Sequence, residues 1–162
     1  MDSENRKVIN ATQVIYNGIK FRSKSELRMY QTILNAGFTP DFESQSFILW
    51  DGCYLQKPYY YEGSPVVTKK GHTKKLQDWV YTPDFIITLG GCSFIIEVKG
   101  NPNDLWPYKR KLFLKLIDTM KDTYFFEVRT MKGLKKTLST IKSIYDEKVA
   151  SSKNGGTSSV SS

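Results

Sequence analysis

Two carboxylates and a lysine lie on the two arms of a predicted β-hairpin, residues 81–99. Both arms are rich in β-branched and aromatic residues, and Gly90-Gly91 supplies a two-residue loop between them. This loop fixes the pairing of the arms, so Asp84 is expected to lie opposite Glu97. Directly opposed residues of an antiparallel pair hold their Cβ atoms about 4.5–5.5 Å apart on one face. Two negative charges at that distance repel each other unless a positive charge lies between them.

A divalent metal ion is a simple candidate for this positive charge. Carboxylate oxygens are ligands that suit Mg²⁺, and metal ions held by carboxylates commonly support phosphoryl transfer. Lys99 lies two residues after Glu97 and is expected on the same face of the hairpin. The alternative is an ordinary ion pair between Lys99 and one of the carboxylates, because structural ion-pair networks also bring such groups together.

The elements before this hairpin are expected to position it. A first hairpin is predicted over 14–21, around an Asn-Gly pair, and a helix over 23–36. Ser23 is the predicted N-cap of this helix, and Glu26 would complete a capping box. The residues predicted for the core face of the helix are Leu27, Tyr30 and Leu34.

A strand is predicted over 42–50, followed by an excursion over 51–80 that has little regular pattern. Loops of this length in compact domains are usually functional or mobile. After the 81–99 hairpin, the sequence predicts a helix over 105–120, a strand over 124–129 and a helix over 133–148. This order predicts an α/β fold, in which helices flank a mixed β-sheet.

Composition supports one globular domain over residues 12–149. The 162-residue chain is 40% hydrophobic and 14% aromatic, which excludes collagen-like, coiled-coil and wholly disordered proteins. Residues 1–11 are predicted to be a flexible N-terminus, and residues 150–162, rich in Ser and Gly, a disordered tail.

The charge balance favours a polyanionic partner. There are 24 Lys and Arg residues against 16 Asp and Glu residues, a formal net charge of +8, which suits nucleic acid. No apolar run is long enough to span a membrane. The start has no secretory leader, and two cysteines cannot form a disulfide framework, so a cytoplasmic location is expected. A phosphate-binding P-loop is missing from the sequence, so no nucleotide cofactor is expected.

The carboxylate hairpin also carries a family resemblance. Pro83-Asp84, twelve intervening residues and then Glu97-Val98-Lys99 resemble the PD-(D/E)XK nuclease signature. FRSKSELRMYQTIL resembles the first core helix of that superfamily, in which a Glu points at the site, and Glu26 matches it. FESQSFIL and YTPDFIITLGGCSFIIEVKG are similar to the N-terminal catalytic domain of TnsA transposition endonucleases. They are equally similar to small phage endonucleases and Holliday-junction resolvases, and the resemblance covers roughly 18–130 without the excursion.

The resemblance implies roles for the matching residues. Asp84, Glu97 and the backbone carbonyl of Val98 would bind Mg²⁺, with Mn²⁺ as a substitute. Lys99 would orient the attacking water or steady the charge that develops on the phosphate. Glu26 would reach a second metal or a metal-bound water, and a purely structural capping role is its alternative.

Gln45 matches a Gln of the TnsA pattern, but Ser46 stands where that pattern usually has Pro. An ordinary strand amide is therefore the alternative for Gln45, which stays a weak candidate for the site.

Two basic segments and several aromatic residues are candidates for contacts with DNA. The predicted phosphate-binding residues are Lys69, Lys70, His72, Lys74, Lys75, Lys109, Arg110 and Lys111. Solvated basic surfaces are the alternative for both segments. Tyr59, Tyr60, Tyr61 and Trp106 could stack on exposed bases, although core packing is the interpretation we favour for most of them.

Together these features predict a Mg²⁺-dependent DNA endonuclease with a restriction-endonuclease-like core of αβββαβ order. A structure-selective, phage-type enzyme similar to Holliday-junction resolvases is favoured, acting on DNA in the bacterial host cytoplasm if it is phage-encoded. Such enzymes commonly act as dimers, so a homodimer is one candidate state. A TnsA-like transposition subunit is one alternative. A basic DNA-binding protein with a nuclease fold and no turnover is the other, although the acid set is intact here.

Overall fold

The computed structural model describes residues 12–68, 73–100 and 103–154. These residues pack into two compact units. The first, which we call the sheet unit, draws on the described segments 12–44, 84–100 and 122–154. The second, which we call the insert unit, consists of the described segments 45–68, 73–83 and 103–121.

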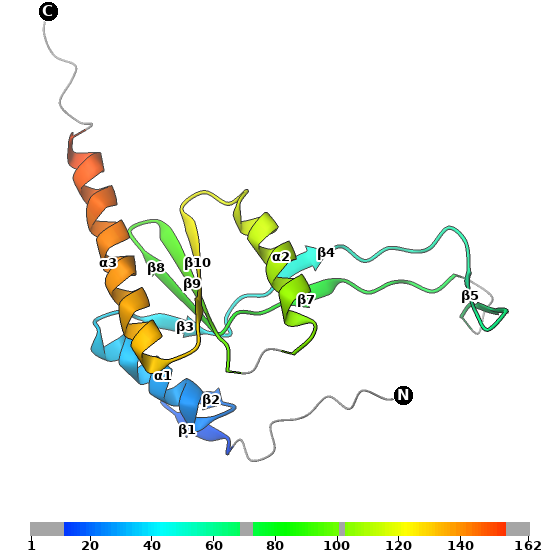
Figure 1. Ribbon diagram of the computed structural model, residues 1–162, viewed down its shortest axis with the longest axis horizontal. Coiled ribbons are helices and arrows are strands. Elements are labelled where there is room, and N and C mark those ends of the chain that lie inside the picture. The colour runs from blue at the N-terminus through cyan, green and yellow to red at the C-terminus, as the bar shows by residue number, and fades with distance from the viewer. Residues whose placement is uncertain (1–11, 69–72, 101–102, 155–162) are drawn as a thin grey trace, which may run out of the picture. The chain divides into compact units, whose positions relative to one another are not determined.

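The sheet unit is built on a four-stranded mixed sheet (Figure 1). Its strands are β3 (Pro40–Phe42), β8 (Phe85–Leu89), β9 (Cys92–Val98) and β10 (Thr123–Val128). They lie in the order β10-β9-β8-β3, in which β8 pairs antiparallel with both β3 and β9, and β10 pairs parallel with β9. The mixed α/β architecture predicted from the sequence is therefore confirmed.

Two helices and a hairpin complete the sheet unit. They are α1 (Lys24–Asn35), α3 (Met131–Asn154) and the antiparallel pair β1 (Val14–Tyr16) and β2 (Ile19–Phe21). In Figure 1, α1 lies beside α3, and the two helices contact each other as well as β3 and β10 respectively. The core between these elements contains a chain of rings, in which Phe21 packs on Tyr30 and Phe42 with centroids 5.1 and 4.6 Å away.

The insert unit has its own aromatic core. Its elements are β4 (Phe47–Trp50), β5 (Tyr59–Tyr61), β6 (Ser64–Val66), β7 (Trp79–Tyr81) and α2 (Trp106–Ile117). The antiparallel pair β4–β7 packs against α2, and Tyr81 lies 4.5 Å from Phe113 and 5.7 Å from Trp106 between ring centroids. From this pair, two long connecting segments lead to the hairpin β5–β6 (Figure 1). None of the three helices among the described residues is long and apolar enough to cross a membrane.

Several predicted elements differ from the observed ones. The strand predicted over 42–50 is two strands, because Glu43 has a left-handed backbone (φ 44°) that ends β3, and β4 pairs with a different partner. Likewise, the first arm of the central hairpin is interrupted between β7 and β8. The helix predicted to end at 148 continues as α3 to Asn154, into the predicted tail. The predicted flexible N-terminus (1–11) and the remainder of the tail (155–162) lie outside the described residues.

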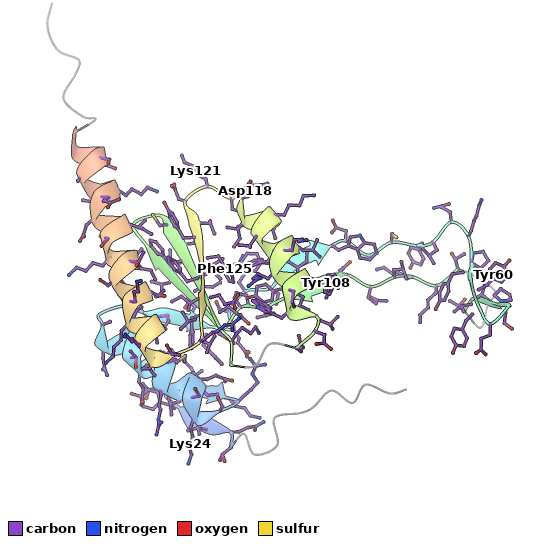
Figure 2. All side chains as sticks on the ribbon, in the orientation of Figure 1. Lys24, Tyr60, Tyr108, Asp118, Lys121 and Phe125 are labelled. Carbon is purple, nitrogen blue, oxygen red and sulfur yellow. The ribbon has the colours of Figure 1, made fainter. Side chains whose placement is uncertain are left out.

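Burial corrects two further expectations. On α1 the buried residues are Met29, Tyr30 and Ile33, whereas Leu27 and Leu34 are only partly buried. The prediction that the tyrosines of β5 pack in a core is wrong. All three are 45–68% exposed, and Tyr60 projects from the far end of the insert unit (Figure 2). Trp106, by contrast, is buried, as we favoured.

Candidate active site

The register of the central hairpin is the one predicted from its Gly-Gly loop. β8 and β9 pair from Leu89 with Cys92 to Phe85 with Ile96. Both loop glycines have positive φ (57° and 77°), a conformation that other residues adopt only with strain. Asp84 directly precedes β8, so continuing this register by one residue sets it opposite Glu97.

Asp84 is a buried carboxylate held against the neighbouring strand. It is 7% exposed, and its Oδ2 accepts a hydrogen bond of 2.7 Å from the backbone N–H of Val98. Burial, reinforced by the negative charge of Glu97, raises its pKa from 3.8 to about 7. The Val98 N–H and the cations Lys99 and Arg22 act in the opposite direction without cancelling this rise in pKa. Negative charge at Asp84 is therefore only partly compensated within the protein.

Glu97 is more deeply buried, at 3% exposed, and its Oε1 forms an ion pair with Nζ of Lys99. The backbone N–H of Lys99 donates a 2.8 Å hydrogen bond to the carbonyl of Val128 on β10, which extends the parallel pairing past the end of β9. The ion pair that the sequence left as an alternative is thus present. It places the ammonium group beside the carboxylates, which a catalytic role would also require.

Arg22 joins three acidic side chains and was not predicted as a site residue. Its guanidinium contacts Glu43, lies 3.5 Å from Asp84 Oδ1 and has its Nε 3.8 Å from Glu26 Oε1. The backbone N–H of Arg22 also donates a 2.8 Å hydrogen bond to Glu26 Oε2. We call Glu26, Glu43, Asp84 and Glu97 the carboxylate cluster.

Glu26 performs only half of the predicted capping box. The Ser23 side chain accepts a hydrogen bond from the backbone N–H of Glu26, as expected. The Glu26 carboxylate accepts the N–H of Arg22 instead of that of Ser23 and also meets the Arg22 guanidinium. Because this carboxylate turns toward Arg22, it lies with the cluster rather than only at the helix terminus.

Glu43 reaches the cluster through the sheet. β3 pairs with β8, and just beyond this pairing the backbone N–H of Glu43 donates a 3.0 Å hydrogen bond to the carbonyl of Asp84. The positive φ of Glu43 costs conformational energy, and residues held in such conformations occur preferentially at functional sites. No local pattern marks Arg22 or Glu43, since only the β3–β8 pairing and the entry to α1 bring them to Asp84.

A further acidic residue extends the row across the sheet. Glu127 on β10 pairs directly with Glu97 on β9, so their side chains share one face. Arg129 accompanies Glu127, with 3.3 Å between its guanidinium and Glu127 Oε1. Each of the three acids at this end of the sheet, Asp84, Glu97 and Glu127, therefore has a basic partner.

Comparison with known families places the chain in one of them. A family model described as "Protein of unknown function (DUF1064)" matches residues 6–137. The chain belongs to the DUF1064 family. Neither the curated proteins nor the solved structures contain a match to it. The part that matches DUF1064 includes the whole carboxylate cluster with Arg22 and Lys99.

The donor set of this DUF1064 chain fits a hard cation that keeps water ligands. Within the described part of the chain, His, Cys, Asp and Glu side chains form no group of three that could hold a metal by themselves. Mg²⁺, however, typically uses one or two carboxylates and retains several waters. Asp84 and Glu97 supply such carboxylates, and the raised pKa of Asp84 indicates negative charge that a cation would stabilise.

The predicted DNA-binding residues that the structure describes belong to the insert unit. Lys74 and Lys75 are exposed, and Nζ of Lys75 lies 5.8 Å from the centre of the Tyr54 ring. On α2, Lys109 and Arg110 are half-buried, and Lys111 is exposed. Gln45 is exposed at the start of the insert unit. The other three, Lys69, Lys70 and His72, lie outside the described residues.

Proposed function

We propose that this chain is a Mg²⁺-dependent DNA endonuclease of the PD-(D/E)XK class with a restriction-endonuclease-like core. The observation that carries the proposal is the juxtaposition of Asp84 with Glu97 at the start of a rigid hairpin, with Lys99 paired to Glu97. Proteins rarely bury neighbouring carboxylates without a compensating partner. The carboxylates, the lysine and a phosphodiester substrate of high negative charge together suit hydrolysis assisted by a cation.

Asp84 and Glu97, with the backbone carbonyl of Val98, would hold the Mg²⁺ ion. When bound, the ion supplies Lewis-acid polarisation of the phosphate and of the attacking water. Nζ of Lys99, which is held beside Glu97, would orient the attacking water or stabilise charge that develops on the phosphate. Glu26 supplies a further acceptor at the entry of α1, as the family resemblance implies for this position.

The formal charge of +8 supports DNA as the substrate. The basic residues of the insert unit would contact phosphates, and the exposed tyrosines of β5 would stack on unpaired bases. Unpaired or branched DNA is therefore the preferred substrate class, with a four-way junction as the leading example. Resolution of such a junction needs two cuts, which a homodimer would provide.

The test is cleavage of supercoiled, linear, single-stranded and four-way-junction DNA with Mg²⁺, with Mn²⁺ and with EDTA. We expect metal-dependent nicking that favours the junction and that is lost in both Asp84→Asn and Glu97→Gln. Asp146→Asn, which neutralises an exposed carboxylate on α3, is the matched control and should retain activity. Tight binding of DNA without cleavage under every metal condition would instead support the non-catalytic alternative.

A further inference from the structure

One arginine, Arg22, contacts three acidic side chains that come from three separate parts of the sheet unit. Glu26 belongs to α1, Glu43 follows β3, and Asp84 precedes β8. The guanidinium of Arg22 meets all three. A single positive charge thus faces three carboxylates, and Asp84 has Glu97 as an additional negative neighbour.

The contact with Asp84 involves the carboxylate oxygen that does not accept the Val98 N–H. Oδ2 of Asp84 already accepts the Val98 N–H at 2.7 Å, whereas Oδ1 faces the Arg22 guanidinium at 3.5 Å. A cation bound through Oδ1 would therefore lie on the side of Asp84 that Arg22 approaches. Two cations there repel each other, and the burial of Asp84 keeps water from screening that repulsion completely.

Arg22 is the member of this arrangement that is able to leave. Its side chain is 62% exposed, whereas those of Asp84 and Glu97 are 10% and 3% exposed. Exposed ion pairs contribute little to stability, so releasing the guanidinium into water costs little. The buried carboxylates, by contrast, are fixed by the hairpin and by the Val98 N–H.

We propose that Arg22 is a built-in counter-cation that competes with the divalent metal for Asp84 and is released from the carboxylates when the metal binds. This inference rests on the proposed metal site. In the metal-free protein, Arg22 compensates part of the negative charge of the cluster and holds Glu26, Glu43 and Asp84 together. Metal binding replaces that compensation with a doubly charged ion and frees the guanidinium to pair with other anions, including phosphate.

The test compares the Mg²⁺ affinity of the full chain and its variants by titration calorimetry. We would use about pH 9, where even a carboxyl of moderately raised pKa is ionised. Arg22→Met should bind Mg²⁺ about tenfold more tightly than the parent. A neighbouring positive charge commonly lowers the pKa of a carboxyl by about one unit, which is a tenfold loss of affinity for the proton, and we expect a similar effect on Mg²⁺. Arg28→Met, which removes an exposed arginine from the first half of α1, should bind as the parent does.

The possible results separate this inference from the proposed function. Unchanged or weaker Mg²⁺ binding by Arg22→Met, with parent binding that disappears in Asp84→Asn, would overturn the role of Arg22 alone. A parent protein that binds no Mg²⁺ through Asp84 would overturn both.

A second measurement needs no variant that must fold. The Nε–Hε group of Arg22 in the parent protein reports its own mobility by ¹⁵N relaxation. We expect this group to become markedly more mobile as Mg²⁺ saturates the site. A guanidinium that stays equally rigid at saturation would show that Arg22 and the metal do not compete.

Discussion

Replacing Asp84 with Asn should stabilise the metal-free protein at alkaline pH and change little at acidic pH. In the unfolded chain the Asp84 carboxyl has its ordinary pKa of 3.8, whereas in the folded protein burial raises the pKa to about 7. Because the folded state holds this proton more tightly, folding is disfavoured whenever the carboxyl must ionise. The penalty is nearly absent below pH 3.8, grows as the pH rises to about 7, and stays constant above it.

The size of the penalty follows from the same two pKa values. Each pKa unit corresponds to ~1.4 kcal/mol, so the rise from 3.8 to about 7 makes the ionised Asp84 cost about 4 kcal/mol. Asn carries no charge, and its side-chain oxygen can still accept the Val98 N–H. For a chain of this size, ~1 kcal/mol shifts the melting temperature by about 2–4 °C. Asp84→Asn should therefore melt up to about 8–16 °C higher than the parent near pH 9.

Thermal melting in EDTA, followed by circular dichroism between about pH 4 and pH 9, measures this difference. The gap between variant and parent should widen across that range, and Asp146→Asn should show no such trend. With Mg²⁺ the difference in melting temperature should narrow or change sign. Only the parent gains the free energy of Mg²⁺ binding, which is about 2.7 kcal/mol at a hundredfold excess over Kd. A gap that does not depend on pH would refute the account of Asp84 as a buried, repelled carboxylate.

Three other perturbations have expected outcomes. Lys99→Met should lower the single-turnover cleavage rate by ~10²–10³-fold with DNA affinity nearly unchanged. A variant that is less stable but fully active would show that Lys99 has only a structural role, in its ion pair with Glu97. Neutralising the four lysines of 69–75 together should flatten the dependence of log K on log salt in DNA titrations, and a slope equal to that of the parent would exclude this segment as a DNA contact. Gly90→Ala should lower the melting temperature, because Gly90 has φ 57° and a Cβ there would lie 2.3 Å from the Tyr145 ring. The backbone strain alone costs ~1–2 kcal/mol. A melting temperature equal to that of the parent would therefore contradict this reading of Gly90.

The parts of the structure that the sequence predicted well depend on local chemistry. The Gly-Gly loop determines the register of β8 and β9, because few other residues tolerate its backbone conformation. Ser23 marks the start of α1 because its side chain bonds a free backbone N–H of the first turn. Both signals lie within a few residues of the feature they determine.

The parts that the sequence missed depend on contacts between distant segments. Glu43 reaches Asp84 because β3 pairs with β8, and Arg22 contacts both from the chain that enters α1. No spacing in the sequence indicates either approach. The three tyrosines of β5 have the composition of a core strand, yet the hairpin that holds them pairs only β5 with β6, and all three are exposed. Composition could not distinguish these two outcomes, since burial depends on the neighbours that the fold supplies.

The hydrogen bond between Glu43 and Asp84 has a consequence for how this protein can vary. These two residues flank the segment 44–83, and the bond from the N–H of one to the carbonyl of the other, at 3.0 Å, closes that segment at its base. The entropy of closing a long loop grows only with the logarithm of its length, so that doubling it costs ~0.6 kcal/mol. We therefore expect insertions and deletions between β4 and β7 to be tolerated better than changes at the base of the segment. The length of this segment can therefore change without moving the carboxylates at its base.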